Sequence, residues 1–242
     1  MSEFEERLTA AKLEAMAEFA AGAGHEINNP IAVIAGRAQL LLDGETDPQR
    51  RRELAVIHTQ AMRVYEMIAD MMLFARPPAP RLADCDVATV AENVVAELAG
   101  KAREKQVRLE LQTCSQPFTL SADANQLAVA VQALCQNGLD AVDRGGCVSV
   151  SVERLPAANI PSEDRIAITV ADDGGGIAAD AQEHLFDPFY CGRPAGRRLG
   201  MGLAKAWRIV RNHRGWISVE NRPTGRAMFT IVLPATVTAS EH

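Results

Sequence analysis

Hydrophobic positions recur at alternating intervals of four and three residues in the first 76 residues of the chain. The first stripe comprises Ile27, Ile31, Ile34, Ala38 and Leu41, and the second comprises Leu54, Ile57, Ala61, Val64, Ile68, Met71 and Ala75. Heptad stripes of this kind are typical of helices that pack along one face. Between them, Asp47 stands at an N-cap position and Pro48 at the first position of a helix. The pattern therefore predicts two helices joined by a short loop, an antiparallel hairpin.

Three prolines, Pro77, Pro78 and Pro80, end this pattern and predict a short, stiff linker. Beyond them, runs that alternate with a period of two, typical of strands, are interleaved with helical runs. The expected strands span 107–112, 118–122, 147–155, 165–173, 216–221 and 226–234, and the expected helices span 87–102, 123–142 and 201–213. Because the strand pairs lie close together, as in hairpins, we expect an α/β sandwich whose mixed sheet is covered on one face by helices.

The expected fold class is therefore α+β multidomain. We expect the helical hairpin in 1–76, the linker in 77–81, the sandwich domain in 82–236 and a tail in 237–242. One hairpin buries too little apolar surface alone, and pairing two of them into a four-helix bundle is an economical solution. The chain is accordingly predicted to be a homodimer.

Composition excludes several classes of protein. The 242 residues are 48% hydrophobic and 23% charged, as in an ordinary globular protein, and the formal net charge of −6 argues against a nucleic-acid partner. No apolar run approaches the ~20 residues of a membrane span, and the acidic N-terminus lacks the apolar core of a signal peptide. The five cysteines are scattered and odd in number, so we expect reduced thiols in a cytoplasmic protein.

The segment GAGHEINNPI, residues 22–31, breaks the rules of a helix interior. Relative to the first stripe, His25 lies off the apolar seam and is expected to face solvent, with Glu26 beside it. A neutral imidazole is a nucleophile toward phosphorus, and a neighbouring carboxylate can accept its proton. A surface histidine without a role is the alternative. A zinc protease is excluded because the second histidine of HExxH is missing.

Two glycine-rich segments are candidate ligand loops. Asp172 ends a strand and precedes Asp173 and three glycines, and a carboxylate there can accept a hydrogen bond from an amine such as that of adenine. Gly200 and Gly202 precede a helix whose free N–H groups and dipole favour an anion, with Arg193 in the same loop. A plain turn and a solvated basic loop are the respective alternatives.

Further candidates lie between these loops. Asn137 and Asp140 share one face of a predicted helix, and an amide oxygen suits Mg²⁺ that also takes phosphate oxygens. Phe186 and Phe189 flank a turn fixed by proline and are either packing residues or anchors of a loop over a nucleotide. A P-loop and a dinucleotide-binding fingerprint are both missing from the sequence.

Taken in order, these segments resemble the boxes of sensor histidine kinases. GHEINNPI resembles the H box, QNGLDAV the N box, DDGGGI the G1 box, LFDPFY the F box and LGMGLA the G2 box. The resemblance extends from about residue 10 to residue 235. It implies a dimerisation and phosphotransfer hairpin followed by a Bergerat-fold ATP-binding domain, with ATP and Mg²⁺ as cofactors.

The resemblance also implies a role for each matched residue. His25 would be the phosphoacceptor, Glu26 its base, and Asn29 the residue that positions water to dephosphorylate a response regulator. Asn137 would be the Mg²⁺ ligand and Asp172 the carboxylate that reads adenine. The other implied ATP-binding residues are Asp140, Gly174, Gly176, Phe189, Arg193, Gly200, Gly202 and Leu203.

Four positions depart from the family's pattern. Ala133 replaces an asparagine, Gly138 an alanine, Asp173 an asparagine and Arg198 a glycine. Hydrolytic relatives on this fold, such as the Hsp90 and MutL types, carry a glutamate where Ala133 stands, which argues against a pure ATPase.

The expected function is autophosphorylation of His25 from Mg-ATP and transfer of the phosphoryl group to an aspartate in the receiver domain of a response regulator. Dephosphorylation of that receiver through Asn29 is a further expectation. The alternative is a degenerate ATP-binding scaffold without kinase activity. Too few residues precede His25 for a sensor domain, so either the chain is the excised core of a longer protein or the signal is expected from a separate sensor domain or protein.

Overall fold

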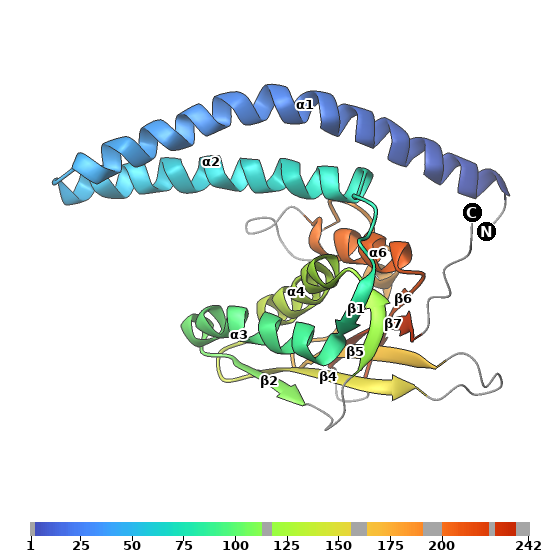
Figure 1. The fold of residues 1–242 in the computed structure, drawn as a ribbon. Helices are drawn as coiled ribbons and strands as arrows, with labels where there is room; N and C mark the ends of the chain where they lie inside the picture. The colour runs from blue at the N-terminus through green and yellow to red at the C-terminus, as the bar shows by residue number, and fades with distance from the viewer. Residues whose placement is uncertain (1–2, 113–117, 156–163, 191–199, 223–225, 236–242) are drawn as a thin grey trace. The chain divides into compact units, whose positions relative to one another are not determined.

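A computed structural model describes residues 3–112, 118–155, 164–190, 200–222 and 226–235 of the chain. The chain divides into two compact units, Met1–Pro78 and Ala79–His242. The first unit is helical, and the second combines helices with strands (Figure 1). Within the described ranges, no helix is both long and apolar enough to cross a membrane.

The first unit is a hairpin of two long helices, α1 (Glu3–Gly44) and α2 (Pro48–Ala75). The Asp47 carboxylate accepts hydrogen bonds from the backbone N–H groups of Gln49 at 2.7 Å and Arg50 at 3.3 Å, and Pro48 occupies the first turn of α2. The predicted helix cap is thus confirmed. α1 continues through Pro30 as one helix, drawn as a single bowed ribbon in Figure 1, because one missing N–H bends a helix without ending it.

The apolar residues of α1 lie on two neighbouring sides of the helix, and only one of these sides packs against α2. Gly24 lies against α2, since a Cβ atom built there would be 3.1 Å from the Met72 sulfur, and Ala38, two heptads later, is 3% exposed. Three large side chains of the stripe stay 40%, 46% and 60% exposed, namely Ile27, Ile34 and Leu41. Residues seven apart share one side of a helix. These three residues, called here the apolar edge of α1, are therefore left uncovered by α2.

The second unit contains eleven elements in the described ranges. They are β1 (Ala83–Asp86), α3 (Val87–Lys105), β2 (Arg108–Gln112), β3 (Thr119–Ala122), α4 (Ala124–Ala141), β4 (Cys147–Leu155), β5 (Arg165–Asp172), α5 (Ala179–Gln182), α6 (Gly202–Asn212), β6 (Trp216–Asn221) and β7 (Ala227–Pro234). The hydrophobic pattern does not predict β1 or α5, which have four residues each.

Five strands of this unit form a mixed sheet in the order β2-β4-β5-β7-β6. β2 pairs with β4 in parallel, and all other neighbours are antiparallel. In β4, Val148, Val150 and Val152 are buried while the residues between them are partly exposed. α3, α4 and α6 lie on one face of the sheet (Figure 1). The predicted hairpin followed by a sandwich with a mixed sheet is therefore confirmed.

Asp123 connects the start of α4 with two distant parts of the second unit. Its carboxylate caps α4 by accepting hydrogen bonds from the N–H groups of Asn125 and Gln126, both at 3.1 Å, and it also accepts one from that of Arg81 at 2.9 Å. Its own N–H donates to Nε2 of the buried His213 at 3.1 Å. Burial would raise the pKa of this carboxyl, but the backbone donors outweigh burial and hold the pKa below its ordinary value.

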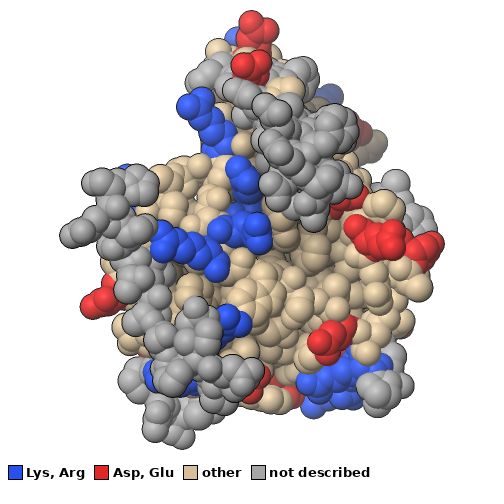
Figure 2. Space-filling model, turned by 90° about the vertical axis from the view of Figure 1, so that its right-hand side faces the viewer, with Lys and Arg blue, Asp and Glu red and all other residues tan. Residues whose placement is uncertain are grey.

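Charge is distributed unevenly over the surface despite the formal net charge of −6. Figure 2 shows Lys and Arg side chains at several places on the surface, some of them beside Asp and Glu side chains. Because charges interact over about 10 Å at ordinary ionic strength, local pairs matter more at a given site than the net charge does.

Candidate functional site

The end of β5 and the turn after it form the first part of the site. Asp172 is 3% exposed, and its Oδ1 accepts a hydrogen bond from the Gly174 N–H at 3.1 Å. A Cβ atom at Gly174 would lie 2.5 Å from the Ala141 carbonyl oxygen, and Gly176 has a φ of +72°. Gly174 has no room for a side chain, and the left-handed backbone at Gly176 would be strained by one. The turn therefore holds a buried carboxylate in a fixed orientation.

Two side-chain contacts that sequence reasoning missed hold this turn. Asn221, at the end of β6, donates from Nδ2 to the Ile177 carbonyl oxygen at 2.6 Å and accepts from the Ile177 N–H at 2.9 Å. Asp173 accepts a hydrogen bond from the Cys147 N–H at 2.8 Å. An asparagine offers the same kind of acceptor oxygen, so aspartate serves at this position although the resembled family commonly has asparagine.

α4 borders both glycine-rich segments. A Cβ atom at Gly138 would lie 3.5 Å from the Asp172 Cβ, and a Cβ atom at Gly202 would lie 4.0 Å from the Ala133 Cβ. Asn137 is partly buried and follows Ala133 by four residues, which places the two on the same side of the helix. Asn137 thus lies on the stretch of α4 that connects Asp172 with the start of α6.

The start of α6 brings two chain segments close together. Gly200 has a φ of +74°, and a Cβ atom there would lie 2.5 Å from the Tyr190 carbonyl oxygen. Met201, at the N-cap, has an apolar side chain that offers no oxygen to the first N–H groups of the helix. Gly202 and Leu203 form the first turn of α6. Uncapped N–H groups at a helix start, together with the helix dipole, attract an anion.

The two phenylalanines of the LFDPFY segment differ in environment. Phe186 is partly buried, whereas Phe189 is 48% exposed and has a φ of +66°. This conformation costs of order 1 kcal/mol or more in a bulky residue. The surrounding structure has to enforce it, and Gly200 packs directly on the Phe189 carbonyl carbon. The predicted packing role therefore suits Phe186 better than Phe189.

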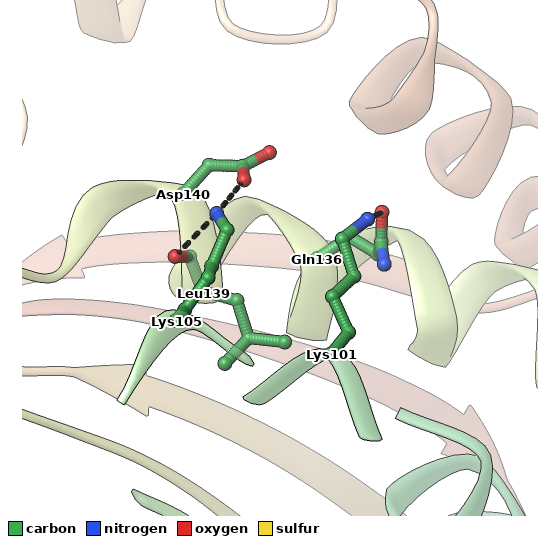
Figure 3. Close-up of polar contacts among 5 residues, drawn as sticks. All are labelled: Lys101, Lys105, Gln136, Leu139 and Asp140. Carbon is green, nitrogen blue, oxygen red and sulfur yellow. Dashed lines mark hydrogen bonds and ion pairs between the residues drawn. The ribbon is translucent and has the colours of Figure 1, made fainter. Parts of the chain in front are cut away.

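Asp140 is engaged by a lysine from another helix. Lys105, the last residue of α3, contacts the Asp140 carboxylate and donates a hydrogen bond to the Leu139 carbonyl oxygen at 3.0 Å (Figure 3). The Lys105 and Asp140 side chains are 28% and 26% exposed. The sequence predicts Asp140 as an ATP-binding residue and gives no signal for Lys105, because the two residues are 35 positions apart.

The candidate phosphoacceptor segment lies in α1. Glu26, Asn29 and Pro30 are exposed. The side chain of His25 is outside the described part of the structure, so its exposure stays a prediction. Arg193 falls in 191–199, which is also outside the described ranges.

The described thiols are poor nucleophiles. Burial raises the pKa of Cys85 and Cys147, and it raises that of Cys135 to about 12. Among the residues that the structure describes, no group of three or more His, Cys, Asp and Glu side chains is arranged to hold a metal ion.

Two family models match the chain. The model described as "His Kinase A (phospho-acceptor) domain" matches residues 15–80. The model described as "Histidine kinase-, DNA gyrase B-, and HSP90-like ATPase" matches residues 122–237. The first match covers α2 and most of α1, and the second covers α4 and the helices and strands that follow it.

Known proteins share this organisation. The chain is 28% identical over 241 residues to Sporulation kinase E of Bacillus subtilis (strain 168), a match that covers 99% of this chain and 31% of the relative. The chain spans about a third to a half of the length of the first curated relatives it matches.

Solved structures share its fold. Full-length ShkA in complex with AMPPNP has a TM-score of 0.78 at 23% identity, covering 92% of this chain and 47% of that one. Histidine kinase ThkA in complex with response regulator protein TrrA has a TM-score of 0.67 at 20% identity, covering 97% of this chain and 66% of that one.

Proposed function

The chain belongs to the histidine kinases, and on this premise we propose that it transfers the γ-phosphoryl group of ATP to His25 and then to an aspartate of a response regulator. The observation that carries the proposal is the convergence of two glycine-rich segments on α4, the helix that carries the segment resembling the N box. Gly202 lies next to Ala133 of α4, and Asp172 lies next to Gly138 of α4, so the segments that resemble the G2 and G1 boxes both border the helix that carries the N box. Such convergence is what a nucleotide site assembled from separate loops requires.

The chemistry of the described residues fits Mg-ATP. The buried Asp172 carboxylate suits the adenine amine, the N–H groups at the start of α6 suit phosphate, and the Asn137 amide oxygen suits Mg²⁺. The remaining proposed ATP-binding residues are Gly174, Gly176, Phe189, Arg193, Gly200, Gly202 and Leu203. Asp140 is not proposed among them, because Lys105 engages its carboxylate. Bound Mg²⁺ would screen the charge of the phosphates.

His25 is the proposed nucleophile. A nitrogen of its neutral imidazole attacks the γ-phosphorus, and the N–P bond forms as the bond to the leaving ADP oxygen breaks. Glu26, the next residue of α1 and exposed, accepts the imidazole proton. In the second step, an aspartate oxygen of the receiver domain attacks the same phosphorus and the N–P bond breaks. Asn29, also exposed, is proposed to orient water for hydrolysis of that phosphoaspartate.

The hairpin is proposed to form a homodimer. The apolar edge of α1 exposes three large aliphatic side chains, and α2 adds Ile57, Tyr65 and Met72, which are 48%, 46% and 37% exposed. A surface of this kind favours burial against a partner, and a second hairpin covers it as a four-helix bundle. The signal is proposed to come from a separate sensor domain or protein.

Incubation with γ-labelled ATP tests the kinase proposal. We expect label that is lost in acid and retained in alkali, as befits phosphohistidine, and we expect the His25→Gln variant to take up none. The His58→Gln variant is the matched control, because His58 is a histidine in α2 of the same hairpin, and it should be labelled like the wild type. Labelling of His25→Gln, or label that resists acid, would contradict the proposal.

A binding module that takes ATP only as a conformational ligand is the second candidate. Ala133, at a position where the family has asparagine, favours it, because a methyl group cannot ligand a metal ion. Calorimetric ATP binding by a protein that never forms phosphohistidine would support this module over the kinase. Asn137→Ala should abolish ATP binding under either proposal.

A further inference from the structure

A ladder of polar contacts joins α3 to α4. Successive contacts are four residues apart on both helices, so the two helices run side by side in the same direction. The three contacts are Gln132 to Glu97 at 3.3 Å, Lys101 to Gln136 at 2.8 Å, and Lys105 to Leu139 and Asp140. Figure 3 shows the second and third of them, with both lysines reaching from α3 to α4.

The third contact differs from the other two because it reaches the backbone. Leu139 is among the last residues of α4, which ends at Ala141, so its carbonyl oxygen lies beyond the last N–H donors of the helix. The Lys105 ammonium donates to this oxygen at 3.0 Å. A cation at the C-terminus of a helix also interacts favourably with the helix dipole. Lys105 therefore caps α4 from a different helix.

The turn that Lys105 caps is the one that borders the proposed nucleotide site. Gly138 packs on Asp172, and the Ala141 carbonyl oxygen packs on Gly174. A shift in this turn would therefore move the backbone against which the G1 segment rests. The residue before Gly138 is Asn137, the proposed Mg²⁺ ligand.

The same contact neutralises a carboxylate close to the proposed phosphate and Mg²⁺ position. Asp140 follows Asn137 by three residues, so their Cβ atoms are about 5–6 Å apart on one face of α4. The sequence nearby adds Asp143, Asp172 and Asp173. An unpaired Asp140 would add to this negative charge and oppose the binding of a triphosphate.

We propose that Lys105 is a positioning residue of the nucleotide site: it fixes the last turn of α4 and neutralises Asp140, so that Asn137 can meet a metal-bound triphosphate. This inference rests on the proposed function, because it presumes that a nucleotide binds beside α4. Lys105 lies outside every segment that resembles a kinase box, and its role follows from the contacts in Figure 3.

Lys101 offers a matched control. It lies one turn earlier on the same side of α3 and donates to the side chain of Gln136 (Figure 3). Lys101→Met and Lys105→Met therefore remove the same charge and one ladder contact each. Only the second change releases Asp140 and the last turn of α4.

Titration of the full chain with a fluorescent ATP analogue, with and without Mg²⁺, tests the inference. We expect Lys105→Met to weaken binding by roughly three- to twentyfold, the range for a partly exposed ion pair plus a helix-end charge. The loss should be larger without Mg²⁺, because the cation offsets the released carboxylate. Lys101→Met should change affinity by less than about twofold, the size of one weak exposed contact. Lys105→Arg should retain most of the affinity, and Lys105→Met combined with Asp140→Asn should recover part of it.

The outcomes separate this inference from the proposed function. If the wild type binds no nucleotide, the proposed function fails and this inference fails with it. If the wild type binds but Lys105→Met binds equally well, or Lys101→Met loses as much, the positioning role alone is overturned. Should Lys105→Met not fold, Asp140→Asn carries the test. This variant keeps the hydrogen bond from Lys105 to the Leu139 carbonyl oxygen and removes the negative charge of Asp140. It should therefore bind nucleotide at least as tightly as the wild type in the absence of Mg²⁺. Weaker binding would overturn the charge argument.

Discussion

Replacing Asn221 with alanine should weaken nucleotide binding without touching the nucleotide. The Asn221 side chain makes two hydrogen bonds to the backbone of Ile177, at 2.6 Å and 2.9 Å. Ile177 directly follows the three glycines of the G1 segment. Glycine loses more backbone freedom on ordering than any other residue, so this turn depends on contacts at its ends. The Asn221→Ala variant removes one such contact and leaves Asp172 in place.

The expected magnitude follows from the two hydrogen bonds. Each is worth about 0.5–1.5 kcal/mol net, and Asn221 is exposed, so water replaces part of the loss. We take about 1–1.5 kcal/mol for the pair, near the lower end of that range. If only the ordered turn binds ATP, the apparent affinity falls in proportion to its population. The variant should then bind more weakly, by up to about five- to thirteenfold.

The assay is the titration of a fluorescent ATP analogue, combined with the rate of His25 labelling as a function of ATP concentration. Loss of preorganisation should raise KM and leave kcat nearly unchanged. Asn125→Ala is the control. Asn125 is also an exposed asparagine, but it lies in the first turn of α4, at the opposite end of that helix from Gly138 and Asp172. A variant at Asn221 that binds as tightly as the control, or that loses kcat at an unchanged KM, would refute the reasoning.

Other changes have separate expected outcomes. Gly200→Ala should cost about 1–2 kcal/mol in urea unfolding from its positive φ alone, and more because the added carbon would lie 2.5 Å from the Tyr190 carbonyl oxygen. Because the pKa of Asp123 is lowered, the unfolding free energy should fall as pH drops below about 4, the ordinary pKa of an aspartate, and Asp123→Asn should flatten this dependence in urea titrations. Cys135, with a pKa of about 12, should resist iodoacetamide until the protein unfolds, as read by mass spectrometry. Asp47→Ala should destabilise the hairpin by about 1 kcal/mol, seen as a lower Tm.

The elements that could be predicted from the sequence are those with a period or a local cap. α1, α2, α4 and the long strands carry several repeats of an apolar spacing. Asp47 and Asp123 cap helices through backbone groups two or three residues away, so the whole interaction is contained in a short segment. β1 and α5 have four residues each, too few to establish a period, and their formation depends on the neighbours they pair with or pack against.

The parts of the candidate site that could be predicted from the sequence are its turns, where the backbone conformation requires glycine. Gly174, Gly176 and Gly200 occupy close or left-handed positions, and such positions select glycine in the sequence itself. Lys105 and Asn221 contact residues that lie 35 and 44 positions away in the sequence. No short segment of the sequence therefore contains both partners of either contact. Their identities are ordinary for a helix end and a strand end, so no pattern distinguishes them.

The apolar stripe of α1 correctly predicts a helix that packs along one face, but its spacing does not say which helix covers that face. Ile27 follows Gly24 by three residues, a rotation of about 60° around the helix, so the two cannot both point directly at α2. Gly24 takes the position against α2, with no side chain to keep the helices apart. Ile27 and its heptad successors keep large aliphatic side chains that are 40–60% exposed in one protomer. A hairpin with no other partner would favour polar residues there. The width of the stripe, more than its period, is therefore the argument for a second hairpin.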